Sequence, residues 1–350
     1  MRIAQIAPLT ESVPPRTYGG TERVVSFLTE ELVAMGHDVT LFASGDSVTS
    51  AKLEAGWPCA LRFDATLRDG LAPHMLLMEK VFQQAQDFDV LHCHLDYWPF
   101  SLLSRQPTPF ITTLHGRLDL PELARIYECF EDAPLVSISD AQRRPLPGGN
   151  FISTVHHGLP VNLLTPRAVP RDYLAFLGRI CPEKAPDRAI RIARAAGIKL
   201  KIAAKIDKVD REYFETEIRP LIDGDEIEMI GEIGEAEKPG FLSGAKALLL
   251  PIDWPEPFGL VMIEAMACGT PTIAFPAGSV PEVIDHGVTG FIVRDEAAAV
   301  AAVQHLDELS PAAIRTRFEQ RFTARRMAED YMALYRRLAV KTRPALRVVT

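Results

Sequence analysis

Short apolar runs alternate with segments of helical periodicity along the whole chain of 350 residues, and this alternation restricts the fold more than any other feature. The runs are continuous rather than interrupted by polar residues, which indicates strands whose two faces are both buried. Strands of that kind belong to a parallel sheet covered by helices on each side. The expected strands are 2–7, 38–43, 89–94, 110–115 and 134–139 in the first half, and 172–178, 199–204, 226–231, 247–252 and 270–275 in the second.

The segments between these strands carry helix signals. Residues 21–35 have helical periodicity and are followed by Gly36, a residue suited to a left-handed helix cap. Further helices are expected, in part or whole, at 185–196, 239–244 and 259–267.

The strand and helix pattern restarts after residues 161–172, a segment with two prolines that is typical of a linker. We therefore predict an α/β protein made of two doubly wound parallel-sheet domains that face each other across a cleft, the first over 1–165 and the second over 170–322. An amphipathic helix at 323–340 follows the second sheet, and we expect it to cross back onto the first domain.

Composition narrows the class of protein. The net charge is −8 and the basic residues are scattered, which argues against a nucleic-acid partner. Residues 1–168 contain 13 basic and 19 acidic side chains, whereas residues 169–350 contain 25 basic and 27 acidic ones. Because the acidic excess lies in the first half, an anionic ligand is expected to bind the second half. Five cysteines without a C-x-x-C pair indicate reduced thiols, and no apolar stretch approaches the roughly 20 residues that span a bilayer. We expect a soluble cytoplasmic protein.

Ligands of open parallel sheets bind beyond the carboxyl ends of the strands. In the first half, Gly19 and Gly20 precede a helix and would let backbone N–H groups approach an anion, although a simple turn fits them equally well. His115 ends a strand and reaches the same edge, with a purely structural histidine as the alternative. His92 and His94 share one strand face, but no third metal ligand is identifiable, so no metal is expected.

In the second half, Arg179 and Lys184 flank a strand-to-helix loop. Two cations at a helix start suit a diphosphate, and a solvated loop with two basic residues is the alternative.

The stretch 255–267 places Glu256 between two prolines, which hold it out of helix in a rigid loop. Gly259 then opens a helix that contains Glu264. Carboxylates accept paired hydrogen bonds from vicinal hydroxyls, and a diphosphate would meet the helix N-terminus. The arrangement favours a nucleotide sugar as ligand.

Residues 255–274 closely resemble the E-x(7)-E signature of retaining glycosyltransferases of family 4, which have the GT-B fold of two Rossmann-like domains. Further segments match that family in the same order: GG near the start, TLHG at 113–116, 137–144, 156–164, GRICPEKAP after the linker and 278–293. The resemblance covers about residues 3–295 and includes both domains.

The resemblance implies roles for the residues of the second domain. It implies that Glu256 contacts hydroxyls of the donor sugar, that Glu264 holds the ribose, and that Arg179 and Lys184 neutralise the diphosphate. Backbone contacts to the sugar and phosphates are implied for Phe258, Gly259 and Leu260.

In the first domain the resemblance implies that His115 lies near the donor sugar and reaction centre, and that Gly19 and Gly20 cover the phosphate and acceptor. The chain departs from the family in two places. Residues 156–158 read His-His-Gly where Pro-Asn-Gly is common, and Lys205 stands where glycine is common, so that Lys205 becomes a further candidate donor contact.

The activity that the resemblance implies is transfer of a hexose from a nucleotide-diphosphate sugar to an acceptor hydroxyl, in carbohydrate biosynthesis. The anomeric configuration would be retained, and neither a metal nor a further cofactor is expected. UDP is favoured over GDP or ADP as the nucleotide, and the acidic first domain favours a small soluble acceptor. Two alternatives are a nucleotide-sugar epimerase of the same fold and a binding protein without catalysis.

Overall fold

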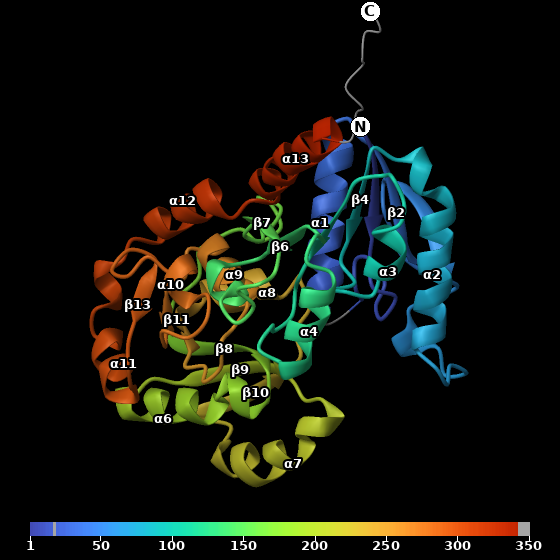
Figure 1. Ribbon diagram of the computed structural model, residues 1–350. Coiled ribbons are helices and arrows are strands. Elements are labelled where there is room, and N and C mark those ends of the chain that lie inside the picture. Colours follow the sequence, from blue (N-terminus) through green and yellow to red (C-terminus); the bar gives the residue numbers. More distant parts are fainter. Residues whose placement is uncertain (17–18, 342–350) are drawn as a thin grey trace, which may run out of the picture. The chain divides into compact units, whose positions relative to one another are not determined.

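The protein divides into two compact units, each built on one parallel sheet, in a computed structural model that describes residues 1–16 and 19–341 (Figure 1). The first unit consists of residues from Met1–Gly158 together with α13 (Ala324–Lys341). The second unit is Leu159–Thr323. The two doubly wound sheets confirm the predicted fold class.

The sheet of the first unit has seven parallel strands in the order β3-β2-β1-β4-β5-β6-β7. Strand β1 lies between β2 and β4, so successive connections run in opposite directions on either side of it. Such a reversal is the point at which doubly wound sheets bind ligands. The strands are β1 (Arg2–Ile6), β2 (Asp38–Ser44), β3 (Lys52–Trp57), β4 (Val90–Cys93), β5 (Phe110–Thr113), β6 (Leu135–Ser137) and β7 (Phe151–Thr154).

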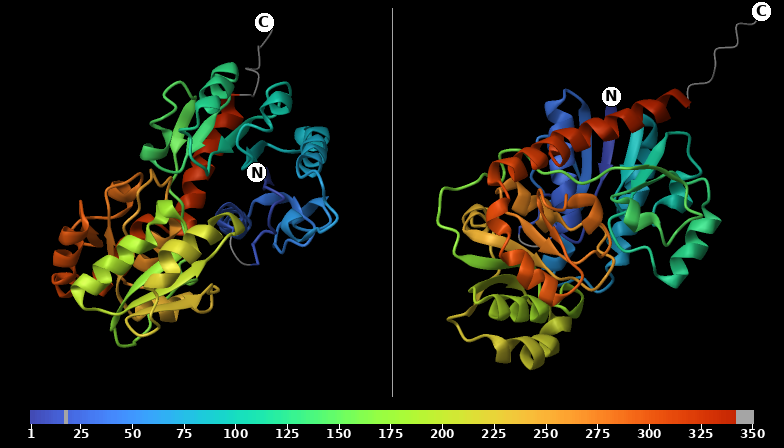
Figure 2. Two further views of the ribbon diagram at one scale, coloured as in Figure 1. Left: turned by 90° about the horizontal axis from the view of Figure 1, so that it is seen from below. Right: turned by 90° about the vertical axis from the view of Figure 1, so that its left-hand side faces the viewer.

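Helices cover both faces of this sheet. Apolar side chains of α2 pack with those of β1, β2 and β4 in one cluster, and Val25 of α1 packs with Leu41 and Ala43 of β2 in another. Helix α13, red in Figure 2, packs against α1 and β4. The helices are α1 (Gly20–Ala34), α2 (Leu71–Gln84), α3 (Phe100–Leu103), α4 (Pro121–Cys129) and α5 (Asp140–Arg143), besides α13.

The sheet of the second unit has six parallel strands in the order β10-β9-β8-β11-β12-β13, with the reversal between β8 and β11. Its core joins the buried faces of α6 and α11 to the strands, and each fully buried aliphatic side chain there contributes about 1.5–3 kcal/mol. The strands are β8 (Tyr173–Arg179), β9 (Leu200–Lys205), β10 (Ile227–Gly231), β11 (Ala245–Leu250), β12 (Thr272–Ala274) and β13 (Gly290–Ile292). The helices are α6 (Pro186–Ala196), α7 (Arg211–Tyr213), α8 (Lys238–Ser243), α9 (Leu260–Ala267), α10 (Val280–Val283), α11 (Glu296–Val303) and α12 (Pro311–Arg321).

All ten expected strands are present, and so are the expected helices, including α1 with Gly36 just beyond its end at φ +82°. The sequence prediction missed β3, β7 and β13. Each of these strands lies at the edge of its sheet and is partly exposed; β3 and β7 lack a continuous apolar run, and β13 is only three residues long. Among the described helices, none has the length and apolarity required to span a bilayer.

Candidate functional site

The predicted ligand-binding residues of the second unit gather at the carboxyl ends of β8 and β11. Arg179 is the last residue of β8, and Lys184 lies in the loop that follows it. Glu256 lies in the loop after β11. Because β8 and β11 are neighbours at the reversal of strand order, these loops meet where doubly wound sheets bind their ligands.

Lys184 and Glu256 form an ion pair in which Lys184 Nζ contacts Glu256 Oε2. The same carboxylate oxygen accepts a hydrogen bond of 3.0 Å from Trp254 Nε1, and Lys184 Nζ lies 5.2 Å from the centroid of the Trp254 ring. Glu256 is only 8% exposed, so a nearly buried carboxylate is held by a cation and an indole donor. The structure thus brings together two predicted site residues that are 72 positions apart.

The Glu256 loop is fixed by the segment that begins with Gly278. Ser279 donates its backbone N–H to Glu256 O at 2.9 Å and its hydroxyl to Phe258 O at 2.8 Å. Gly278 has φ +57°, and a Cβ atom at that position would lie 2.3 Å from the Glu256 backbone nitrogen. Only glycine permits this approach, which holds the Glu256 carboxylate in place.

Gly259 precedes α9 in the left-handed conformation, with φ +74°, and Leu260 is the first helical residue. The first N–H groups of a helix lack partners within it and favour a negative charge. On the same helix Glu264 is 5% exposed and accepts a hydrogen bond of 2.6 Å from Lys238 Nζ. Sequence reasoning missed Lys238, which is the first residue of α8.

Arg179 and Lys205 share a different counterion. The two residues are aligned on β8 and β9, and Lys205 Nζ lies 2.9 Å from Asp207 Oδ1. Arg179 lies 3.7 Å from Asp207 Oδ2 through its NH1 and 3.4 Å from Asp210 Oδ2 through its Nε. Lys184 is therefore paired with Glu256, whereas Arg179 and Lys205 are paired with the carboxylates of Asp207 and Asp210.

In the first unit, His115 follows β5 and is partly buried. Its Nε2 lies 2.8 Å from His94 Nδ1, and its ring stacks on His157 with centroids 5.3 Å apart. Burial lowers the pKa of His115 to about 3, so its ring is neutral at physiological pH. Gly19 precedes α1 and Gly20 begins it, and a Cβ atom on Gly19 would lie 2.8 Å from Pro15 Cβ.

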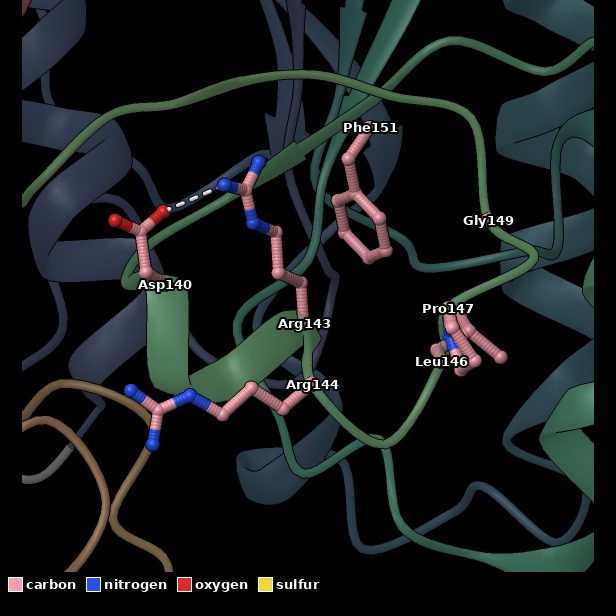
Figure 3. A pocket seen from close by; sticks show the side chains of 7 residues that line it. All are labelled: Asp140, Arg143, Arg144, Leu146, Pro147, Gly149 and Phe151. Atoms are coloured by element: carbon pink, nitrogen blue, oxygen red, sulfur yellow. Dashed lines mark ion pairs between the residues drawn. The ribbon is translucent and has the colours of Figure 1, made fainter.

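A hollow of about 480 Å³ opens beside α5 in the first unit (Figure 3). Arg143 pairs with Asp140 at 2.9 Å, and the side chain of Arg144 extends away from that pair. The hollow is lined by Asp140, Arg143, Arg144, Leu146, Pro147, Gly149 and Phe151.

His92 and His94 both form hydrogen bonds with neighbouring side chains. His92 contacts Tyr335 and Thr113, each at 2.7 Å, and His94 contacts Gln5 at 2.9 Å. Within the part of the chain that the structure describes, no group of three His, Cys, Asp or Glu residues is arranged to hold a metal ion.

Two family models match the chain in succession. The model described as Glycosyltransferase Family 4 matches residues 18–182, and the one described as Glycosyl transferases group 1 matches residues 166–322. Among the curated relatives is D-inositol 3-phosphate glycosyltransferase of Mycolicibacterium smegmatis, which is 32% identical over 47% of this chain and 39% of the relative. The chain thus spans less than half the length of that relative.

Solved structures resemble the chain over nearly its full length. A glycosyltransferase involved in avilamycin A biosynthesis superposes with a TM-score of 0.76 and 23% identity over 97% of this chain and 98% of that one. The Anabaena protein HepE, solved in complex with UDP-glucose, gives a TM-score of 0.72 and 16% identity over 97% of this chain and 100% of that one. These structures share the GT-B fold with this protein. The solved structures show the fold alone, whereas the two family models, which in succession match residues 18–322, identify the chain as a glycosyltransferase of family 4.

Proposed function

We propose that the protein transfers a sugar from a nucleoside diphosphate sugar to a hydroxyl group of an acceptor, with retention of anomeric configuration and without a metal ion. The observation that carries the proposal is the Lys184–Glu256 pair at the carboxyl ends of β8 and β11. It combines a cation for phosphate with a carboxylate for sugar hydroxyls at the location where doubly wound sheets hold nucleotides.

The diphosphate would be held by positive charge from three side chains and one helix. The three side chains are Arg179 at the end of β8, Lys184 in the loop after β8, and Lys205 at the end of β9. The helix is α9, which begins at Leu260, four residues after Glu256. On binding, phosphate oxygens would replace the carboxylate partners of Arg179 and Lys205, whereas Lys184 would contact a phosphate oxygen and keep Glu256. Fixed positive charge of this kind stabilises a departing diphosphate as its negative charge develops, which is the contribution that a metal would otherwise make.

The two glutamates would divide the sugar groups between them. Glu256 would accept hydrogen bonds from hydroxyls of the transferred sugar, while Lys184 and Trp254 hold its carboxylate. Glu264 would accept from the ribose, and its bond to Lys238 makes Lys238 a positioning residue for that contact. A glycoside hydrolase would instead need both carboxylates beside the same glycosidic bond. In this protein Glu256 is held by Lys184 and Glu264 by Lys238.

UDP-glucose is the donor we test first, because the neighbour HepE binds it. A small hydroxyl-bearing acceptor is in keeping with the name of the inositol phosphate relative. No dedicated base is needed, since the departing phosphate oxygen can take the proton of the acceptor hydroxyl.

Thermal unfolding in the presence of UDP-, GDP- and ADP-glucose tests the donor proposal. A ligand at 100 times its Kd stabilises the native state by about 2.7 kcal/mol, so the matching donor is expected to raise the melting temperature by several degrees. UDP should stabilise the protein and UMP, which lacks the second phosphate, should do so much less. Absence of any shift with all three sugars and with UDP would contradict the proposal.

The product made from the stabilising donor then separates transfer from its alternatives. Proton NMR of the anomeric centre is expected to show the configuration of the donor. Interconversion of the donor without an acceptor would identify an epimerase, and tight binding without turnover across a broad acceptor panel would identify a binding protein.

A further inference from the structure

Trp254 contacts both members of the Lys184–Glu256 pair. Its Nε1 donates a hydrogen bond of 3.0 Å to Glu256 Oε2, and the centroid of its ring lies 5.2 Å from Lys184 Nζ. An indole N–H can only donate and a carboxylate oxygen can only accept, so the direction of this bond is fixed. A cation over an aromatic ring at this distance is attracted to the ring face. One side chain therefore holds the carboxylate through its N–H and the ammonium group through its ring.

A three-residue turn brings Trp254 and Glu256 together. Glu256 donates its backbone N–H to Trp254 O at 2.8 Å across Pro255. A bond between residues two positions apart closes a γ-turn, and the proline at its centre restricts the backbone of that turn. The residue before the turn is also tied, because Asp253 donates its backbone N–H to Glu183 O at 3.1 Å in the loop after β8. The backbone of both loops thus supports the contacts that Trp254 makes.

Both donors to Glu256 contact the same carboxylate oxygen. Lys184 Nζ and Trp254 Nε1 both contact Oε2, and within the described parts of the chain no group donates a hydrogen bond to Oε1. Glu256 is only 8% exposed, so water has little access to replace a donor that is removed. Without the Trp254 N–H, the direction of the carboxylate would depend on Lys184 alone.

We propose that Trp254 is a positioning residue of the donor site, which fixes the direction of the Glu256 carboxylate through its N–H and the place of the Lys184 ammonium group through its ring. The inference rests on the proposed function for its ligand, a nucleoside diphosphate sugar. The two parts of the side chain then affect different parts of that ligand. The N–H acts on the sugar through Glu256, and the ring acts on the diphosphate through Lys184.

The indole resonances of the full chain, labelled with ¹⁵N and free of ligand, test the contact itself. The chain has three tryptophans, and the resonance that Trp254→Phe removes is that of Trp254. A hydrogen bond to a carboxylate moves an indole proton downfield and slows its exchange with water. We expect Glu256→Ala to move this resonance upfield and to speed its exchange, while the other two indole resonances stay in place. An unchanged Trp254 resonance in Glu256→Ala would overturn the inference whether or not the protein transfers sugar.

Two substitutions of Trp254 separate the effect of its N–H from that of its ring. Phenylalanine keeps an aromatic face and has no N–H, whereas leucine has neither. For Trp254→Phe we expect the Kd of UDP-glucose to rise about tenfold, the value of one hydrogen bond to a charged group, and the Kd of UDP to stay within about twofold. For Trp254→Leu both dissociation constants should rise, because Lys184 also loses its aromatic contact. Isothermal titration calorimetry measures these constants.

Trp57→Phe is the matched control, because it removes an indole–carboxylate bond in the first unit. Trp57 Nε1 donates to Asp64 Oδ2 at 2.9 Å. This variant is expected to leave the Kd of UDP and that of UDP-glucose within about twofold of the wild type. Melting temperatures check that each variant is folded.

Two results with Trp254→Phe would contradict the proposal while leaving the proposed function intact. Equal rises in the Kd of UDP and of UDP-glucose would assign Trp254 a structural role only. Unchanged values for both ligands would show that its N–H does not affect the donor site. Failure of the wild type to bind either ligand, with the indole contact present, would instead overturn the proposed function and with it the donor role of Trp254.

Discussion

Replacing Lys184 by alanine is expected to lower kcat of sugar transfer about a thousandfold, the scale typical of removing one fixed charge that stabilises a transition state. Lys184 supplies a cation at the carboxyl end of β8, where its side chain is 18% exposed and already holds Glu256. Without it, the negative charge that grows on the departing diphosphate loses one of the cations proposed to stabilise it. Initial rates at saturating UDP-glucose and acceptor measure the effect.

Two matched variants separate charge from folding. Lys184→Gln keeps a hydrogen-bond donor for Glu256 but removes the charge, so it should lose nearly as much activity as Lys184→Ala. Lys199→Ala removes a lysine from an exposed ion pair with Glu228 and should leave kcat within about twofold. Melting temperatures check that the variants are folded, because loss of a partner of a buried carboxylate costs about 1–3 kcal/mol. Near-normal turnover in folded Lys184→Ala would rule out its role at the diphosphate.

Mild acid is expected to destabilise the first unit strongly. His92, His94, His115 and His157 have pKa values lowered chiefly by burial, so they stay neutral in the folded state. In the unfolded chain they take up protons below about pH 6.5. The unfolded state therefore binds more protons, and the free energy of unfolding falls as the pH drops below 6.5.

Each buried histidine contributes a loss of up to about 1.4 kcal/mol per pH unit. The net loss between pH 7 and 5.5 is then about 3–5 kcal/mol.

The unfolding of the first unit can be measured apart from that of the second by hydrogen exchange. The exchange rates of the β1, β4 and β5 backbone amides are followed as the urea concentration is raised. The expected result is a clear fall in the urea midpoint of these amides from pH 7 to pH 5.5. The β8 and β11 amides of the second unit, which contains none of the four histidines, serve as the control in the same sample. An unchanged midpoint for the first unit would contradict the neutral, buried state of the cluster.

The central strands of both sheets could be predicted because strands buried on both faces have continuous apolar sequences. Residues of β11 such as Leu248 and Leu249 form a continuous apolar run, as strands covered on both faces require. Edge strand β3 places Lys52 and Glu54 in an ion pair at the surface, and β13 depends on Gly290, where a Cβ atom would lie 2.0 Å from Thr272 O. These strands form through contacts with their neighbours, which no local pattern displays.

The sequence singles out the residues of the candidate site but not the pairs that they form. Glu256 is marked by its two flanking prolines and Lys184 by its position after a strand. Their contact depends on β8 and β11 being adjacent, a property of the strand order. Lys238 was missed because its role appears only once α8 and α9 pack together and bring it to Glu264.

A crystal structure of the protein with UDP-glucose tests the central claim most directly. The account predicts the diphosphate within hydrogen-bond distance of Lys184 Nζ and of the first backbone N–H groups of α9, with sugar hydroxyls at the Glu256 carboxylate. Nucleotide density elsewhere on the chain, with the Lys184–Glu256 pair undisturbed, would contradict it.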